Sequence, residues 1–250
     1  MIKIERLSAP EELTPEVIAE KTARFKADPK HNHVWKESYI ESRLMEMTHN
    51  KCCYCECRLG EESKYMEVEH FHDKSKYQDE VVVWDNLFPS CKSCNGSKSD
   101  HDTIAAPIVN PVLDNPGDHL GFKHFRYIGK DEKGRETIEV LNLNDSVKKC
   151  MPRFMICIAL EELLEEIRNN LENIDITSRT QDISRLRNKV LKLLQECQCD
   201  SPYTAVKASM VASDSTFLYL VKKMKERGWW TPIMDELASR MESYQLDILS

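Results

Sequence analysis

The sequence has no long uninterrupted apolar run, and its first residues, MIKIERLSAPEEL, mix charged and apolar side chains from the start. A membrane-spanning helix needs about 20 consecutive apolar residues, and a secretory signal needs an apolar segment of its own. Neither pattern is present, so we expect a cytoplasmic protein. The chain also lacks internal repeats of fixed period and low-complexity tracts, which leaves one large domain or a small domain with a helical extension.

An excess of positive charge is also missing, because 35 Lys and Arg residues face 42 Asp and Glu residues, for a net charge of -7. A chain with this balance does not attract a polyanion as a whole, so any nucleic-acid contact must use local patches. Residues 51–100 hold seven basic and ten acidic residues, whereas residues 179–227 hold ten basic and five acidic residues. Helices at 21–36 and 179–227 are therefore candidate basic faces, although ordinary solvated helix surfaces would show the same pattern.

Ten cysteines are present, and six of them crowd around one short segment. In a cytoplasmic protein such cysteines indicate metal ligation or buried thiols more than disulfides. Cys52-x2-Cys55 and Cys91-x2-Cys94 each place two thiolates on a tight turn, and together they supply the four sulfurs that a structural Zn²⁺ prefers. Cys53 and Cys57 form an alternative pair, but their longer spacing fits the turn less well. The pattern predicts a zinc site with four cysteine ligands.

The order of elements predicts an α+β fold. Thr14-Pro15 is typical of a helix start and predicts a helix to about Ala27, ended by Asp28-Pro29. Apolar spacing predicts a second helix over about 34–47. Strands are expected at 65–71 and 81–89, a short helix from Lys92, and a further strand at 137–143 in a connector with three prolines.

From Met151 onward apolar residues recur at helical spacing, and we expect further helices at about 203–212, 214–227 and 232–247. The expected domains are an N-terminal strand and helices (1–50), a zinc-knuckle module with its connector (51–145) and a helical C-terminal region (146–250).

Three short stretches surround the cysteine pairs: Val68-Glu69-His70-Phe71, Trp84-Asp85-Asn86-Leu87, and Cys94-Asn95-Gly96-Ser97-Lys98. These residues resemble the HNH (ββα-metal) nuclease family, in the variant in which the last histidine is asparagine. In that family an acidic residue and a histidine end the first strand of a small hairpin, an asparagine precedes the second strand, and His or Asn lies on the following helix. The resemblance implies a zinc-stapled ββα-metal module.

Carried over to these positions, the resemblance implies that His70 is the general base, since a neutral imidazole can take a proton from water. Glu69 and Asn95 would hold one catalytic Mg²⁺ or Mn²⁺, Asn86 would orient the loop and the imidazole, and Lys98 would contact a backbone phosphate. The family often has Asp where this chain has Glu69, and the extra methylene moves the carboxylate. His72 and His101 are alternative ligands.

The similarity extends over about residues 1–145 through MIKIERLSAPEEL, KCCYCECRLGEESKYMEVEHF, CKSCNGSKSD and IVNPVLDNPGDHLGF, which resemble the PtuB family of Septu-type and some retron-linked antiphage systems. The resemblance implies a bacterial defence nuclease that works with an SMC/ABC-like ATPase of the PtuA kind. We expect partner binding in the helical region 146–250, which lies outside the stretches that carry the resemblance. DNA is the favoured substrate, and RNA, including tRNA, is an alternative. A zinc-ribbon adaptor that binds a partner or nucleic acid without cutting is the competing interpretation.

Overall fold

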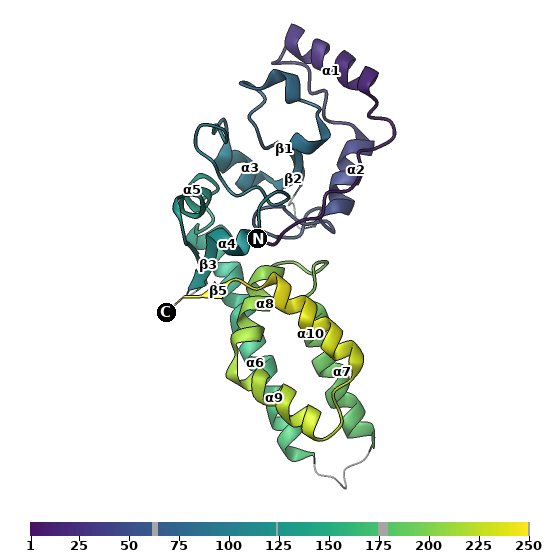
Figure 1. The fold of residues 1–250 in the computed structure, drawn as a ribbon, viewed down its shortest axis with the longest axis vertical. Helices are drawn as coiled ribbons and strands as arrows, with labels where there is room; N and C mark the ends of the chain where they lie inside the picture. Colours follow the sequence, from purple (N-terminus) through teal and green to yellow (C-terminus); the bar gives the residue numbers. More distant parts are fainter. Residues whose placement is uncertain (62–64, 124, 175–179, 250) are drawn as a thin grey trace. The chain divides into compact units, whose positions relative to one another are not determined.

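The computed structural model describes residues 1–61, 65–123, 125–174 and 180–249. It divides into two compact units, the first formed by Met1–Leu120 and Ile128–Asn144 and the second by Gly121–Tyr127 and Asp145–Ser250 (Figure 1). Residues 1–50, which we expected as a separate part, belong to the same unit as the cysteine-rich segment. Residues 62–64 of that segment and Arg179 of the basic stretch lie outside the described residues.

The first unit contains short helices and a pair of strands. In chain order these are α1 (Pro15–Ala27), α2 (Ser38–Met47), β1 (Met66–His70), the 3-10 turns η1 (Gln78–Glu80) and η2 (Trp84–Asn86), β2 (Leu87–Cys91), α3 (Lys92–Lys98), α4 (Pro116–His119) and α5 (Glu132–Val140). The predicted start of α1 is confirmed, because the Thr14 side chain accepts a hydrogen bond from the Val17 N–H and Pro15 is the first helical residue. The second helix starts later than predicted, at Ser38.

Strands β1 and β2 pair antiparallel, with Glu67 opposite Ser90, Glu69 opposite Phe88 and His70 opposite Leu87. Helix α3 begins at the residue after β2 and packs on both strands (Figure 1). Because side chains alternate along a strand, Glu67 and Glu69 leave β1 on one face and His70 leaves it on the other. At the end of β1, one face of the hairpin therefore carries the two glutamates and the other face carries the histidine.

The loop between the strands differs from the prediction of a strand over 81–89. Its backbone turns through η1 and η2, and β2 starts only at Leu87. The Asn86 side chain causes this turn: its oxygen accepts from the His72 N–H at 2.7 Å, and its amide donates to the carbonyls of His72 and Glu80 at 3.1 and 3.2 Å. A side chain that bonds three backbone groups holds the loop closed in place of strand pairing.

The predicted strand at 137–143 is wrong, because this segment lies in and just after α5. The helix is capped by Asp131, whose carboxylate accepts from the Gly134 N–H at 2.7 Å. Thr137, a strand-favouring residue, is fully buried, and its hydroxyl donates to the Lys133 carbonyl one turn earlier and accepts from the Val109 N–H. Capping and burial override the weak local preference of these residues.

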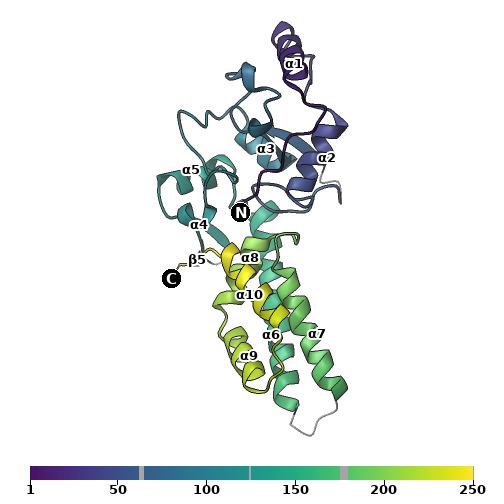
Figure 2. The ribbon, with the colours of Figure 1, turned by 45° about the vertical axis from the view of Figure 1, so that its right-hand side comes forward.

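The second unit is mainly helical, as predicted. Its elements are a π-helical turn η3 (Ser146–Cys150), α6 (Met151–Asn173), α7 (Thr180–Glu196), α8 (Thr204–Ser213), α9 (Ser215–Glu226) and α10 (Pro232–Tyr244). These helices pack along one another around a core of Leu, Ile, Val and Met side chains (Figure 2). None of the helices in the described ranges is long and apolar enough to cross a lipid bilayer.

Three short strands accompany the helices, in the order β4 (Arg126–Gly129), β3 (Leu120–Lys123) and β5 (Asp247–Ile248). Strand β5 runs parallel to β3, with Gly121 opposite Asp247 and Phe122 opposite Ile248. The last residues of the described chain are therefore tied to a segment far earlier in the sequence.

We predict that Gly134→Ala destabilises the protein by about 2 kcal/mol, because a Cβ there would lie 2.0 Å from the His119 carbonyl oxygen. Gly96→Ala is the matched control in a helix, since a Cβ at Gly96 meets nothing within 4 Å. The control should stabilise by about 0.5 kcal/mol through the lost backbone entropy of glycine. Urea unfolding followed by circular dichroism measures both, and equal effects of the two changes would contradict the close approach at Gly134.

Candidate metal centre and catalytic site

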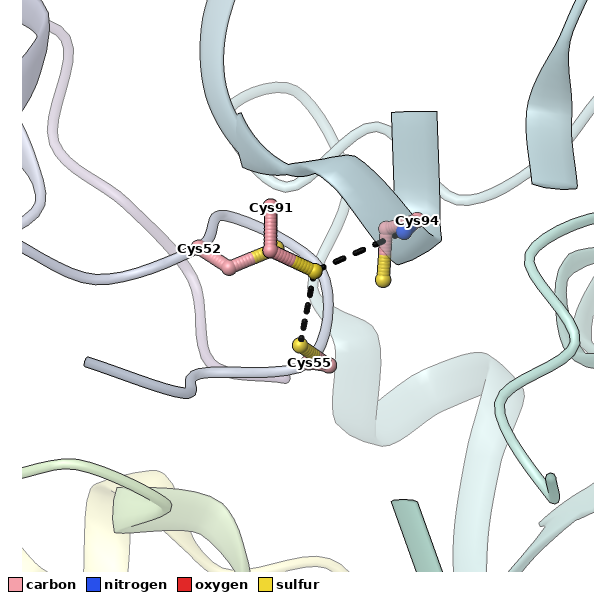
Figure 3. A group of neighbouring side chains, drawn as sticks. All are labelled: Cys52, Cys55, Cys91 and Cys94. Atoms are coloured by element: carbon pink, nitrogen blue, oxygen red, sulfur yellow. Dashed lines mark hydrogen bonds between the residues drawn. The ribbon is translucent and has the colours of Figure 1, made fainter. Parts of the chain in front are cut away.

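Four cysteine side chains meet in the first unit. The sulfurs of Cys52, Cys55, Cys91 and Cys94 all lie within 4.8 Å of one another, and those of Cys55 and Cys91 are 3.7 Å apart. Figure 3 shows the four side chains converging, with the Cys91 sulfur between Cys55 and the backbone of Cys94. The two x2 pairs predicted from the sequence are thus the ones brought together.

The backbone around the two cysteine pairs brings their sulfurs together. Cys91 is the last residue of β2, and its sulfur accepts a hydrogen bond from the Cys94 N–H at 3.4 Å, so the same sulfur caps α3. The first pair sits on a turn after α2 that is bound to β2 through the Cys53 N–H and the Pro89 carbonyl, at 2.9 Å. That turn continues through Glu56, whose φ of 61° lies in the left-handed region.

The donor set fits zinc. Zn–S bonds of about 2.3 Å in a tetrahedron require sulfurs about 3.8 Å apart, close to the Cys55–Cys91 separation. The four cysteines are free of disulfides and buried, apart from a slight exposure of Cys55. The group could hold a metal ion and is consistent with a structural zinc.

His70, at the end of β1, is buried and held on two sides. Its Nε2 lies 2.9 Å from the Val81 carbonyl oxygen. A carbonyl only accepts, so Nε2 carries the proton and Nδ1 presents its lone pair. The Trp35 ring meets the imidazole edge to face at 4.8 Å. This tautomer is the one in which Nδ1 can take a proton.

The environment keeps this imidazole uncharged. Burial, together with the positive charge of Lys74, lowers the pKa of His70 to about 3, although the bond to Val81 opposes the shift. A neutral imidazole at neutral pH is the form that a general base requires.

Asn86 acts on His70 through the loop. Its amide binds the carbonyl of Glu80, the residue before Val81, and its backbone carbonyl accepts from the Phe71 N–H at 2.9 Å. The Asn86 side chain bonds the backbone of the loop that carries the Val81 carbonyl. Its role in orienting the imidazole stays a prediction.

Glu69 is buried on the opposite face of β1. Its carboxylate lies 2.8 Å from the Lys98 ammonium and accepts from the Tyr54 hydroxyl at 3.3 Å. Burial raises the pKa of Glu69 to about 7, although Lys98 and Tyr54 oppose the shift. Lys98 also donates to the His70 carbonyl at 2.7 Å and is only 2% exposed. Its ammonium is therefore bound to two groups of the protein itself, the His70 carbonyl and the Glu69 carboxylate.

Asn95, on the first turns of α3, faces the same side of β1 as Glu69. Its amide nitrogen donates to the Glu67 carboxylate at 2.7 Å, which leaves the amide oxygen to bind a cation. Carboxylate and amide oxygens are the ligands that Mg²⁺ and Mn²⁺ prefer, so the predicted role of Glu69 and Asn95 as ligands of such an ion stays a prediction. The hydrogen bond from Asn95 to Glu67 was not expected from the sequence, although Glu67 lies two residues before Glu69 on the same face of the strand.

The structure brings Glu69, Lys98 and Asn95 to the α3 side of β1 and places the His70 imidazole on the other side of the same strand end. The two alternative ligands are engaged elsewhere. His72 Nδ1 lies 2.6 Å from Glu80, and His101 Nε2 lies 2.7 Å from the Ala106 carbonyl. The assignments of base, metal ligands and phosphate contact stay predictions, each with its position now defined.

We predict that Cys55→Ser removes the metal. Zinc measured by inductively coupled plasma mass spectrometry should fall from one equivalent to nearly none, and the free energy of unfolding should fall by more than about 4 kcal/mol. Cys197→Ser, at a buried cysteine of the second unit, is the control and should keep the zinc. Zinc retained in Cys55→Ser but lost in Cys57→Ser would show that the other pair holds the ion.

The pKa of His70 predicts a loss of stability in acid. Between about pH 6.5 and about pH 3 the unfolded chain binds a proton that the folded chain does not, so stability falls as the pH falls. The free energy of unfolding of the zinc-loaded protein minus that of His70→Gln should shrink by about 2 kcal/mol from about pH 8 to about pH 5. Glu69 contributes with the opposite sign between about pH 4.5 and about pH 7, but it is present in both proteins. A difference that does not change with pH would contradict the neutral imidazole.

Comparisons with known proteins identify relatives over nearly the whole chain. Septu protein PtuB of Bacillus thuringiensis is 41% identical over 246 residues, which cover 97% of this chain and 94% of that protein. Septu protein PtuB of Bacillus mycoides (strain KBAB4) is 26% identical over 235 residues, or 77% of this chain and 79% of that protein. No family model matches the chain. The first alignment is long and similar enough to show common descent, and the chain belongs to the Septu PtuB family.

Proposed function

We propose that the chain is a metal-dependent HNH-type endonuclease that hydrolyses phosphodiester bonds, and that it is an effector of antiphage defence. One observation carries the catalytic part: a neutral imidazole, tethered through Nε2 to the Val81 carbonyl, stands at the end of a strand whose other face carries Glu69 and faces Asn95. A neutral imidazole with a fixed tautomer is suited to activating water for attack on a phosphate, and the oxygen groups on the other face of the same strand end are suited to holding the metal.

In the proposed reaction, His70 Nδ1 takes a proton from a water molecule and the water oxygen attacks the phosphorus. The bond from phosphorus to the 3′-oxygen breaks, and the leaving oxygen departs with the electron pair. A Mg²⁺ or Mn²⁺ held by Glu69 and Asn95 would neutralise charge on the phosphate and on the leaving oxygen. Val81 and Asn86 hold the imidazole in place throughout, which spares the reaction the cost of orienting it.

The proposed substrate is DNA, with RNA such as tRNA as the alternative, because this chemistry does not use a 2′-hydroxyl. The segment that carries the site is acidic overall, with seven basic and ten acidic residues over 51–100. It is poorly suited to hold a polyanion by net charge alone. A partner that brings the nucleic acid would solve this problem.

We also propose that the chain works with a partner protein. The relatives are named as Septu proteins. An SMC/ABC-like ATPase of the PtuA kind is the proposed partner, and the helical residues 146–250 are the proposed binding region. Exposed apolar side chains on η3 and α6, namely Val147, Met151 and Met155, support a contact there.

We predict that His70→Ala abolishes cutting, with a loss of at least about 1,000-fold, while zinc content and the circular dichroism spectrum stay unchanged. The assay incubates the protein, with and without the proposed ATPase partner, with DNA and RNA in Mg²⁺ or Mn²⁺. Omitting the added Mg²⁺ or Mn²⁺ should stop the reaction and leave the zinc in place.

His31→Ala is the matched control, because His31 is exposed and pairs only with Asp28 in the described part of the first unit. It should cut like the wild type. If no substrate is cut in a His70-dependent way under any of these conditions, the nuclease proposal is wrong and the zinc-ribbon adaptor takes its place.

A further inference from the structure

Trp35 is a buried residue that packs against His70, the proposed base. Its ring is held edge to face by Phe25 at 5.8 Å and by His33 at 5.4 Å, and it meets the His70 imidazole at 4.8 Å. The ammonium of Lys74 lies 5.3 Å from the centroid of the same ring. One indole therefore contacts both the imidazole and a lysine.

Lys74 differs from the other lysines around it. Lys26 is paired with Asp79, Lys76 lies 3.6 Å from Asp102, and Lys98 is buried against Glu69. Within the described ranges no carboxylate lies at ion-pair distance from Lys74, and its only charge-related contact is with Trp35. It is partly exposed, on the loop that begins just after His70. A cation of this kind is available to a ligand.

Lys74 is also close to the His70 imidazole, because both contact the ring of Trp35. The loop that carries Lys74 begins just after His70, at the end of β1. An anion held there would lie beside the base.

We propose that Lys74, held on the indole of Trp35, is the cation that contacts the substrate phosphate next to His70. The ligand class is a nucleic-acid phosphodiester, and the inference rests on the proposed nuclease function. Trp35 is then a positioning residue: the cation–π contact restricts the long lysine side chain before substrate arrives, so less entropy is lost on binding. Lys98, the phosphate contact predicted from the sequence, would have to leave Glu69 to compete for this role.

The first test measures binding, so that it does not depend on cutting. In the His70→Ala background, with the proposed ATPase partner present, the affinity for a short duplex is measured by fluorescence anisotropy at several salt concentrations without added Mg²⁺ or Mn²⁺. Lys74→Gln should weaken binding about tenfold and reduce the slope of log K against log salt by about one. Lys76→Gln removes the same charge two residues away. It should change the affinity by no more than about twofold and leave the slope of log K against log salt unchanged.

The second test measures cutting by the protein with intact His70. Lys74→Gln should lower kcat/KM about 10- to 100-fold, as expected for loss of a charged hydrogen bond, and Lys74→Arg should restore most of it. Trp35→Leu should reproduce the reduced salt slope, and adding it to Lys74→Gln should have little further effect on that slope. If Trp35 only supports the fold, Trp35→Leu should lower the thermal midpoint of unfolding and leave the salt slope of binding unchanged.

The outcomes separate the two proposals. If His70-dependent cutting is absent but Lys74 still sets the salt slope, the nuclease proposal fails and the phosphate site stands. If Lys74→Gln binds and cuts like Lys76→Gln, or if neither wild type nor variant binds nucleic acid, the phosphate site is overturned whatever His70 does.

Discussion

The meeting of four sulfurs joins β2, α3 and the turn after α2 at one point of the first unit. Strands β1 and β2 have five residues each, and a two-stranded pair of this length is not stable alone in water. Cys91 serves at once as the end of β2, the cap of α3 and one of the four sulfurs, while Cys52 and Cys55 tie in the turn after α2. A zinc ion at this point would contribute its binding energy directly to folding.

The clamped hairpin holds polar groups that are costly to bury. Glu69, His70, Asn86 and Lys98 are each at most 4% exposed. A buried ion pair such as Glu69–Lys98 is weak evidence for stability, because desolvation offsets most of the attraction. Buried charged groups and perturbed pKa values are concentrated at functional sites. This cost is consistent with the proposed role of the strand end in catalysis.

The charge that is available to a ligand differs between parts of the chain. The acidic excess around the hairpin limits binding of a polyanion by net charge, so individual unpaired cations such as Lys74 matter more than the total. Many basic residues of the second unit are already paired, including Arg185 with Asp182, Lys189 with Glu166 and Lys225 with Asp235. Their positive count in the sequence therefore overstates the charge available to a ligand.

Local sequence patterns predicted the features that depend on neighbours along the chain: the start of α1 at Thr14-Pro15, the choice of the two x2 cysteine pairs, strand β1 and the helical second unit. The prediction was wrong at α5, where the Asp131 cap and the burial of Thr137 override local strand preference. Three contacts follow from tertiary packing alone: Asn95 with Glu67, the buried Lys98 with Glu69, and the Lys74 ammonium with the Trp35 ring. These contacts join segments that are distant along the chain, and such distances are set by packing, which no local pattern of residues encodes.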